Sequence, residues 1–349
     1  FLAPLNRPES IGSNQNTLYS LITIEGGSIM NLAGFARCVW FLLALWFLWV
    51  SGAAQAQTYP SRAIRMILPF ANDTLARPLA HALSESLGQQ VVVDARPGGQ
   101  TIIGTEIATR SAGDGYTILM ITNTHTIHET LRRDLPYNLL QGFVPLTQLS
   151  TLTMILAVNA AVPANSLAEL IALAKSRPGK LNYASSAPIY QLPMELFKAM
   201  AGVDIVHVLY KSSANARIDV VSGQVEVILI GLNSILPQVK TNRVRALAVA
   251  GVKRSEALPD VPTVAETGLS GYDGDGWNGF LAPAGTPAAI GKRLQTEIAS
   301  YLERPAVRAA FIVQGAVPVG STPEHFGAFL KQDIEKWAKV IRISGIKAQ

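Results

Sequence analysis

Two spacings of apolar residues follow one another in the first strongly patterned stretch of the chain. An apolar run from Ile64 to Phe70 predicts a buried strand. After a short polar turn, apolar side chains recur every three or four residues, which predicts an amphipathic helix. The buried stripe of this helix is predicted to contain Leu75, Leu79, Ala82, Leu83 and Leu87.

The polar turn between this strand and helix is a candidate site for an anion. Asn72 or Asp73 is the expected N-cap, because either side chain can accept a hydrogen bond from a free N–H group of the first helical turn. A helix that begins directly after a strand points N–H groups and the positive end of its dipole at one spot, which favours a carboxylate. An ordinary strand–helix connection has the same pattern, so this segment alone does not decide between the two.

The alternation of strand and helix continues through the chain. Strands are predicted within 64–70, 90–99, 116–121, 154–159, 180–185, 204–210, 224–231, 245–250 and 278–283. Helices are predicted at 103–111, at 167–176 with Ser166 as N-cap, around 195–201, at 214–222, near Asn233-Ser234, and at 287–303, 304–314 and 322–344. This order predicts an α/β fold of two domains, each a mainly parallel sheet flanked by helices, that close like a clamshell on a small ligand.

The boundaries of the two domains follow from this pattern. Domain 1 is expected to comprise 57–158 and about 277–320, and domain 2 to comprise 159–276. The helix in 321–349 is expected to pack back across both domains.

Polar residues follow several of the predicted strands. Ligands of open α/β sheets bind beyond the carboxyl ends of the strands, so we expect loops 71–74 and 122–126 to lie side by side. Thr122, Asn123 and Thr124 are candidate hydrogen-bond donors to a ligand. The alternative is that they only cap the end of their strand.

Other candidates come from the second half of the chain. Ser185 and Ser186 are suited to contact a carboxylate, or else form a hinge turn. Lys211 could pair with a ligand anion, although lysines are more often solvated. Trp277 could form an apolar wall of the cleft or pack between domains.

The sequence contains no recognisable catalytic or metal-binding motif. His125 and His128 lie three residues apart, but no third ligand candidate is nearby, so we expect no metal and no cofactor. The glycines Gly99 and Gly104 have the spacing of a phosphate loop without the Lys and Ser/Thr that must follow, and there is no GxSxG motif. We therefore expect a binding protein rather than an enzyme.

Composition narrows the class of ligand. The chain has 349 residues, of which 49% are hydrophobic and 15% charged, and a net charge of +5. No basic run is longer than Arg132-Arg133, which favours attraction of small anions and argues against nucleic acid. Cys38 is the only cysteine, so the chain from Gln57 onward has neither disulfides nor thiolate chemistry. We expect a monomer.

The N-terminal part of the sequence predicts export. Residues 1–29 begin with Phe1 and are unpatterned, so we expect them to be a non-native upstream extension. Residues 30–56 have the basic start, apolar core and Ala54-Gln55-Ala56 ending of a signal peptide. We expect cleavage after Ala56 and a periplasmic location.

The chain from about Tyr59 to its end resembles the periplasmic solute-binding proteins of the tripartite tricarboxylate transporter type, the Bug (Bordetella uptake gene) or TctC-type family. The segments that carry the resemblance include ILPF (67–70), LGQQVVVDARPGG (87–99), DGYTIL (114–119), ELIALAKSRPGKLNYASS (169–186), ELFKAMAGVDIVHVLYK (195–211) and LPDVPTVAETGL (258–269). The resemblance implies a two-domain, type II-like Venus-flytrap fold without catalysis. It also implies that loops of both domains hold a carboxylated solute, partly through ordered waters, and that a membrane permease of the tripartite type is a partner.

The binding loops depart from the family pattern. The first loop of the family reads Pro-Phe-x-x-Gly-Gly-x-x-Asp, whereas here Ala71-Asn72-Asp73 follow Phe70, with Asp73 matching the family Asp. In the second domain, Ser185-Ser186 are followed by Ala187-Pro188 in place of a glycine-rich loop. Ile230 stands where the family has an Asp. Loops that lack glycine allow fewer backbone N–H groups to approach an anion closely.

Two interpretations follow. The first is a periplasmic receptor that captures a small organic carboxylate for uptake. The second is a divergent paralogue that binds an apolar or aromatic acid, or acts as a sensor or interaction protein; Ile189, Tyr190 and Ile230 in the cleft would favour such an acid over citrate. The candidate ligand contacts are Phe70, Ala71, Asn72, Asp73, Thr74, Thr122, Asn123, Thr124, His125, Ser185, Ser186, Tyr190, Tyr210, Lys211, Ile230 and Trp277.

Overall fold

The structure is a computed structural model that describes residues 39–41, 59–71 and 74–346. Outside the described residues lie the predicted cleavage point after Ala56, most of the predicted signal and upstream segments, and the candidate residues Asn72 and Asp73. The chain divides into two units, Phe1–Gln57 and Thr58–Gln349, and the sheets described below belong to the second. In the described part of the chain, no helix has both the length and the apolar character needed to cross a membrane.

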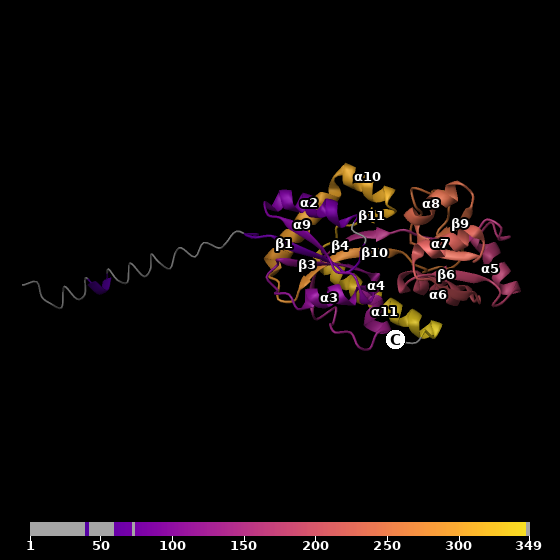
Figure 1. The fold of residues 1–349 in the computed structure, drawn as a ribbon, viewed down its shortest axis with the longest axis horizontal. Helices are drawn as coiled ribbons and strands as arrows, with labels where there is room; N and C mark the ends of the chain where they lie inside the picture. Colours follow the sequence, from indigo (N-terminus) through magenta and orange to yellow (C-terminus); the bar gives the residue numbers. More distant parts are fainter. Residues whose placement is uncertain (1–38, 42–58, 72–73, 347–349) are drawn as a thin grey trace, which may run out of the picture. The chain divides into compact units, whose positions relative to one another are not determined.

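Six strands of the second unit form one sheet in the order β11-β4-β10-β3-β1-β2 (Figure 1). These strands are β1 (Ile64–Leu68), β2 (Val91–Ala95), β3 (Thr117–Thr122), β4 (Phe143–Leu152), β10 (Gly276–Pro283) and β11 (Ala316–Pro318). The accompanying helices are α2 (Ala76–Leu87), α3 (Ile102–Thr109), α4 (Asn123–Leu131), α9 (Ala288–Glu303), α10 (Pro305–Val313) and α11 (Pro323–Ser344), with the short turn η1 (Gly99–Thr101). We call this sheet and its helices the first lobe.

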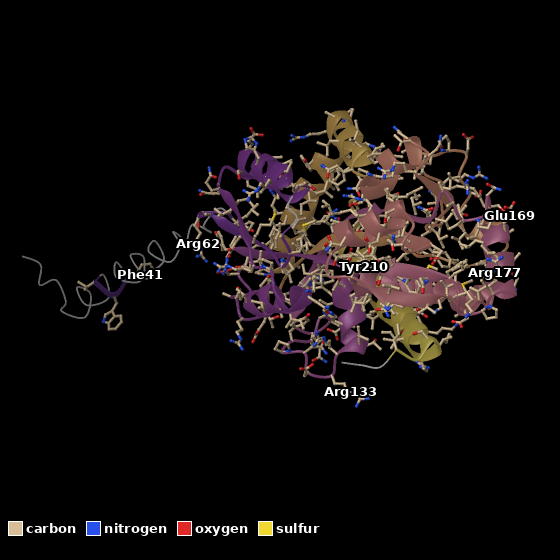
Figure 2. The ribbon with its side chains drawn as sticks, turned by 45° about the vertical axis from the view of Figure 1, so that its right-hand side comes forward. Phe41, Arg62, Arg133, Glu169, Arg177 and Tyr210 are labelled. Carbon is tan, nitrogen blue, oxygen red and sulfur yellow. The ribbon has the colours of Figure 1, made fainter. Side chains whose placement is uncertain are left out.

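Five strands form a second sheet in the order β7-β6-β8-β5-β9. They are β5 (Met154–Asn159), β6 (Asn182–Ser185), β7 (Val206–Leu209), β8 (Val227–Gly231) and β9 (Val244–Val249). The helices of this second lobe are α5 (Leu167–Ser176), α6 (Pro188–Ala201), α7 (Ser213–Ser222) and α8 (Leu232–Lys240), and η2 (Ala265–Thr267) follows β9. Figure 2 shows Glu169 and Arg177, near the two ends of α5, at the edge of this lobe.

The α/β class with two sheets is confirmed, but both sheets are mixed rather than mainly parallel. β1, β2 and β3 are parallel, whereas β10 is antiparallel to both β3 and β4. The reason is that β4 carries the chain out of the first sheet and β10 brings it back, so these two strands run in opposite directions. In the second sheet β5 enters from β4 and is antiparallel to β8 and β9.

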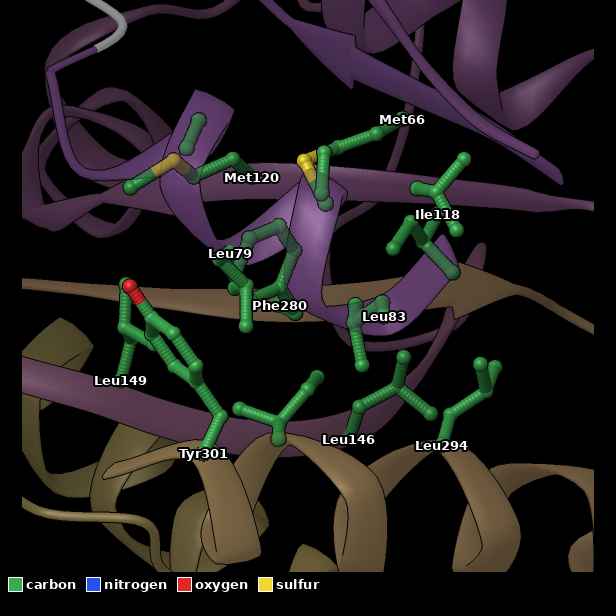
Figure 3. Close-up of a cluster of buried hydrophobic side chains, with 14 of the residues drawn as sticks. Met66, Leu79, Leu83, Ile118, Met120, Leu146, Leu149, Phe280, Leu294 and Tyr301 are labelled. Carbon is green, nitrogen blue, oxygen red and sulfur yellow. The ribbon is translucent and has the colours of Figure 1, made fainter. Parts of the chain in front are cut away.

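The predicted apolar stripe of the first helix is confirmed as part of the core. Leu79, Ala82, Leu83 and Leu87 of α2 are buried in one apolar cluster with strands of the first sheet and with α9. Figure 3 shows Leu79 and Leu83 of α2 in one cluster with Met66 and Ile118 of the sheet and Leu294 of α9. Burial of each such side chain contributes about 1.5–3 kcal/mol, so this cluster holds α2 on the sheet.

The start of α2 differs from the prediction. The helix begins at Ala76 with Leu75 as N-cap, and no side chain caps it. The predicted N-cap at Asn72 or Asp73 is therefore wrong, because a turn at Thr74 and Leu75 comes before the first helical residue. In the second lobe the predicted cap is confirmed, since the Ser166 hydroxyl accepts a hydrogen bond from the Glu169 N–H at 3.2 Å.

The last helix contacts both lobes. α11 packs against α4 of the first lobe and α6 of the second. Trp337 of α11 is fully buried in an apolar cluster with Ile127 of α4 and Leu192 of α6. The chain passes from the first sheet to the second at Thr153, so we propose a domain boundary there instead of after residue 158.

Candidate ligand-binding site

A cavity of about 270 Å³ lies where the two lobes meet. Its walls come from the first lobe, from the second lobe and from the strands that cross between them. The lining residues are Phe70, Thr74, Leu75, Ala76, Met120, Thr122, Leu152, Thr153, Met154, Ile189, Tyr190, Gly231, Asn233, Ser234, Asn278, Gln314 and Gly315. None of these described lining residues carries a formal charge.

Four helices begin at this cavity. Leu75 is the N-cap of α2, Thr122 that of α4 and Gly231 that of α8, while Ile189 and Tyr190 belong to the first turn of α6. The N-cap residues of α2, α6 and α8 make no side-chain cap hydrogen bond, and the first N–H groups of any helix have no partner within the helix itself. Each helix end carries roughly half a positive charge, so the cavity is suited to an anion although its lining is neutral.

Thr122 is held rigidly at the start of α4. Its hydroxyl accepts a hydrogen bond from the Thr124 N–H at 3.3 Å, and Nδ1 of His125 lies 3.1 Å from the Thr122 backbone nitrogen. Nε2 of His125 lies 3.0 Å from the hydroxyl of Thr105. Burial, reinforced by neighbouring His128, lowers the pKa of His125 to about 3. The imidazole is therefore neutral, and it supports the helix start from behind the cavity.

Consecutive residues of β10 face opposite ways. Asn278 lines the cavity, and its Oδ1 accepts a 2.8 Å hydrogen bond from the Ser150 hydroxyl of β4. Trp277 points away from this cavity, and its indole N–H donates to Oδ2 of buried Asp333 at 3.0 Å. Of the two roles considered for Trp277, the structure shows packing, since it lies edge-on to Phe326 and Phe329 of α11.

The predicted contacts divide into those that line the cavity and those that do not. Phe70, Thr74, Thr122 and Tyr190 line it, as does Ile189. The two segments that were expected side by side meet at Thr74 and Thr122, which share the cavity wall because β1 and β3 are neighbours in the sheet. The prediction of a loop at 122–126 is wrong, because Thr122 caps α4 and the helix begins at Asn123. The predicted contacts that do not line it, among the residues that the structure describes, are Ala71, Asn123, Thr124, His125, Ser185, Ser186, Tyr210, Lys211, Ile230 and Trp277.

The two serines and Tyr210 already have partners within the second lobe. The Ser185 hydroxyl lies 2.7 Å from Nε2 of His207, and the Ser186 hydroxyl lies 2.8 Å from that of Ser213. The Tyr210 hydroxyl donates to Oδ2 of Asp219 at 2.8 Å. These three hydroxyls therefore make contacts within the second lobe, and none of their side chains lines the interlobe cavity.

The other residues lie too deep or too far out. Ile230 is 2% exposed in an apolar cluster with Ile155 and Ile228. Asn123 and Thr124 are buried in α4, while Lys211 is exposed outside the cavity wall. Among the described residues, no three His, Cys, Asp or Glu side chains come together to hold a metal ion.

The prediction missed five polar lining residues, which are Thr153, Asn233, Ser234, Asn278 and Gln314. Asn233 and Ser234 follow a strand and open a helix, which is the same signal that pointed to Thr122. Asn278 is one position beyond the predicted Trp277, and successive side chains of a strand point to opposite faces of the sheet, so only one of the two can face the cavity. Gln314 follows the end of α10, where the sequence carries no binding signal.

Two α/β lobes joined by crossing strands around an interlobe cavity define a solute-binding protein. The model of the tripartite tricarboxylate transporter family receptor matches residues 75–346. The chain therefore belongs to this family of periplasmic receptors, and the resemblance seen in the sequence is confirmed.

Individual relatives agree with this assignment. Protein BugT of Bordetella pertussis is 36% identical over 306 residues, which cover 85% of this chain and 94% of that protein. A solved structure of a periplasmic transporter is 37% identical, with a TM-score of 0.73, and covers 83% of this chain and 100% of that one. A solved structure of an R. palustris protein with adipate is 33% identical, with a TM-score of 0.74, and covers 83% of this chain and 99% of that one.

Proposed function

We propose that this protein is a receptor that captures a small organic acid in the cavity between its lobes. The observation that carries the proposal is the convergence of four helix starts, three of them without a side-chain cap, on one neutral cavity. A buried carboxylate needs hydrogen-bond donors and a favourable potential, and helix starts supply both.

The lining favours an acid with a hydrocarbon body. Phe70, Met120, Leu152, Met154 and Ile189 form the apolar part of the wall. Burial of one ligand CH₂ group against apolar side chains contributes about 0.8 kcal/mol to the free energy of binding. A ligand hydroxyl buried against the same side chains finds no hydrogen-bond partner and costs free energy. We therefore expect a chain or aromatic acid to bind better than citrate, and a similar protein has been solved with adipate.

The contacts that we propose for the ligand combine predicted and newly found residues. Thr122, Tyr190, Asn233, Ser234 and Asn278 supply hydroxyl and amide groups at the cavity wall. Of the originally expected set, Asn72 and Asp73 adjoin the wall residue Thr74 in sequence and stay proposed contacts.

Delivery and location complete the proposal. Export through the signal segment 30–56, with cleavage after Ala56, would place the receptor in the periplasm as a monomer. A permease of the tripartite type would receive the captured acid. The sensor or interaction role is the second candidate, because the changed loops would suit a receptor that no longer delivers its solute.

The test is thermal melting of the chain from Gln57 to Gln349 with a panel of acids. The panel contains adipate, benzoate, octanoate and citrate, with the neutral amides of the first three as controls. Ligand at a hundred times its dissociation constant adds about 2.7 kcal/mol to the free energy of unfolding, which raises the melting temperature visibly. We expect a shift with at least one hydrocarbon acid, a smaller one with citrate and none with the amides.

Two variants test whether the shift in melting temperature comes from binding in the cavity between the lobes. Thr122→Val should reduce the shift, whereas Lys211→Ala, which removes a charge outside the cavity, should leave it unchanged. A flat panel from well-folded protein would overturn acid capture and favour the sensor role. Equal shifts with acids and amides would show that the helix starts do not select a carboxylate.

A further inference from the structure

A second cavity, of about 580 Å³, lies on the other face of the crossing strands, and we call it the rear cavity. Side chains of successive strand residues point to opposite faces. Leu152 and Asn278 line the first cavity, while their neighbours Thr151 and Trp277 line the rear one. Thr153 lines both cavities, so the two spaces share a wall where the strands cross.

Both lobes contribute to the rear cavity. The segment 252–256, which follows β9 of the second lobe, forms one side. Arg308 and Ile312 of α10 and Val317 of β11, all in the first lobe, form another. A molecule held there would contact both lobes at once.

Two of the cationic side chains that line the rear cavity form no ion pair with another described residue. Four cationic side chains line it, and two of these are paired, since Arg254 contacts Glu266 at 2.9 Å and Lys336 contacts Asp273 at 3.3 Å. The other two, Lys253 and Arg308, form no side-chain hydrogen bond or ion pair within the described residues.

The lining acids do not cancel these cations. Asp275 is buried and accepts a 2.9 Å hydrogen bond from the Met154 N–H, and burial raises its pKa to about 7. Glu256 is the lining acid that has no partner in the described part of the chain. The lining side chains comprise four cations and three acids, one of which is the buried Asp275, so the wall has an excess of cationic groups, which favours an anion.

The remaining wall is apolar and partly open to solvent. Ile312 and Phe329 line it, together with Val252, Val317 and Val319, which are 68%, 48% and 42% exposed. Apolar side chains that gather at an open hollow are typical of a binding site, because solvent-exposed apolar area is otherwise scattered. The chemistry of the rear cavity is thus amphipathic.

We propose that the rear cavity binds an amphipathic organic anion, with its apolar body against Val317, Val319 and Phe329 and its acidic group on Lys253 and Arg308. The cavity has about twice the volume of the first, so it admits a larger molecule than the first cavity does. This site is separate from the proposed capture of a small acid.

The probe for the test is 1-anilinonaphthalene-8-sulfonate, which combines an aromatic body with one anionic group and fluoresces in apolar surroundings. We expect saturable binding of one probe per chain to the protein from Gln57 to Gln349, with displacement by decanoate. Replacing both cations, as Lys253→Ala with Arg308→Ala, should raise the dissociation constant at least tenfold. The matched control is Lys240→Ala with Arg243→Ala, which removes the same charge from exposed positions outside the cavity.

Each outcome decides the proposal. An unchanged dissociation constant in the Lys253 and Arg308 variant, or an equal loss in the control variant, would overturn it. Asn278→Ala should leave probe binding unchanged, and loss of the probe in that variant would place it in the first cavity instead. Near-ultraviolet circular dichroism of each variant shows that the side-chain packing is retained, since this probe also binds loosely packed states.

Discussion

The hydroxyl of Ser150 donates a 2.8 Å hydrogen bond to Oδ1 of Asn278, and this contact joins β4 to β10 beside the interlobe cavity. The two residues are direct partners in the antiparallel pairing of these strands. The bond orients the Asn278 side chain, so that its amide N–H₂ group, which makes no hydrogen bond with any other described residue, is available to the ligand.

We expect Asn278→Ala to weaken binding of the acid found in the melting panel by about tenfold to a hundredfold. A hydrogen bond to a charged group contributes about 1.5–3 kcal/mol, and this variant removes the donor. Ser150→Ala should cost less, because it frees the orientation of the amide without removing it. Isothermal titration calorimetry measures both, and a larger loss in Ser150→Ala than in Asn278→Ala would contradict the assignment.

Trp277→Phe should destabilise the protein by about 1–3 kcal/mol. The indole N–H donates to Asp333, which is 3% exposed and also accepts a 2.6 Å bond from the Thr126 hydroxyl. A buried carboxylate that loses a donor keeps its desolvation cost, so the folded state loses free energy. Urea denaturation measures the change. The affinity for the acid should fall less than in Asn278→Ala, and the reverse order would place Trp277 in the ligand site.

Asp275 should make the protein less stable as the pH rises from about 4 to above 7. Burial raises the pKa of Asp275 from 3.8 to about 7, so the folded state favours the neutral carboxyl. Its contribution to stability is fully present below the unfolded value and is lost as the pH rises through the folded value. The full shift corresponds to roughly a few kcal/mol.

Asp275→Asn tests this contribution. The amide oxygen can still accept the bond from the Met154 N–H, while the titrating group is gone. Melting temperatures at pH 5 and pH 8 should therefore differ less in the variant than in the parent protein. The same pH dependence in both proteins would show that Asp275 does not titrate in this range.

His128 should make the protein less stable as the pH falls from about 6.5 to below 4, which is the opposite pH dependence to that of Asp275. Burial, with the nearby charge of Arg132, lowers the pKa of His128 from 6.5 to about 4. The folded state favours the neutral imidazole, so the contribution to stability is present above pH 6.5 and is lost as the pH falls through about 4. His128→Leu should reduce the loss of stability between pH 7 and pH 4.5, as measured by denaturant unfolding. A steeper loss in the variant would contradict the prediction.

Much of the fold was predictable because it depends on local patterns. The stripe Leu79, Leu83 and Leu87 indicated α2, and Ser166 indicated the start of α5, from spacing and capping alone. β4 was not predicted, because a bulge interrupts the alternation of its residues. Asn278 of β10 pairs with Ser150, and the next residue of β10, Gly279, pairs with Gln148, so Leu149 of β4 has no pairing partner.

The candidate site was predictable only in part. Thr74 and Thr122 were found because both follow strands that are neighbours in one sheet. Ser185 satisfied the same local rule and Ile230 was expected from the family pattern. The Ser185 hydroxyl nevertheless contacts His207, and Ile230 is buried in the apolar core. A position at the end of a strand does not specify which neighbour its side chain meets.

The sequence by itself determined most of the elements of this protein and its family, since these follow from short-range spacing and from motifs, but it did not predict β4, β11 or α4. Only the tertiary structure decided that Asn278 faces the first cavity while Trp277 faces Asp333. The physical reason is that the direction of a strand side chain depends on the register with neighbouring strands, and the partners of β10 lie far away along the chain.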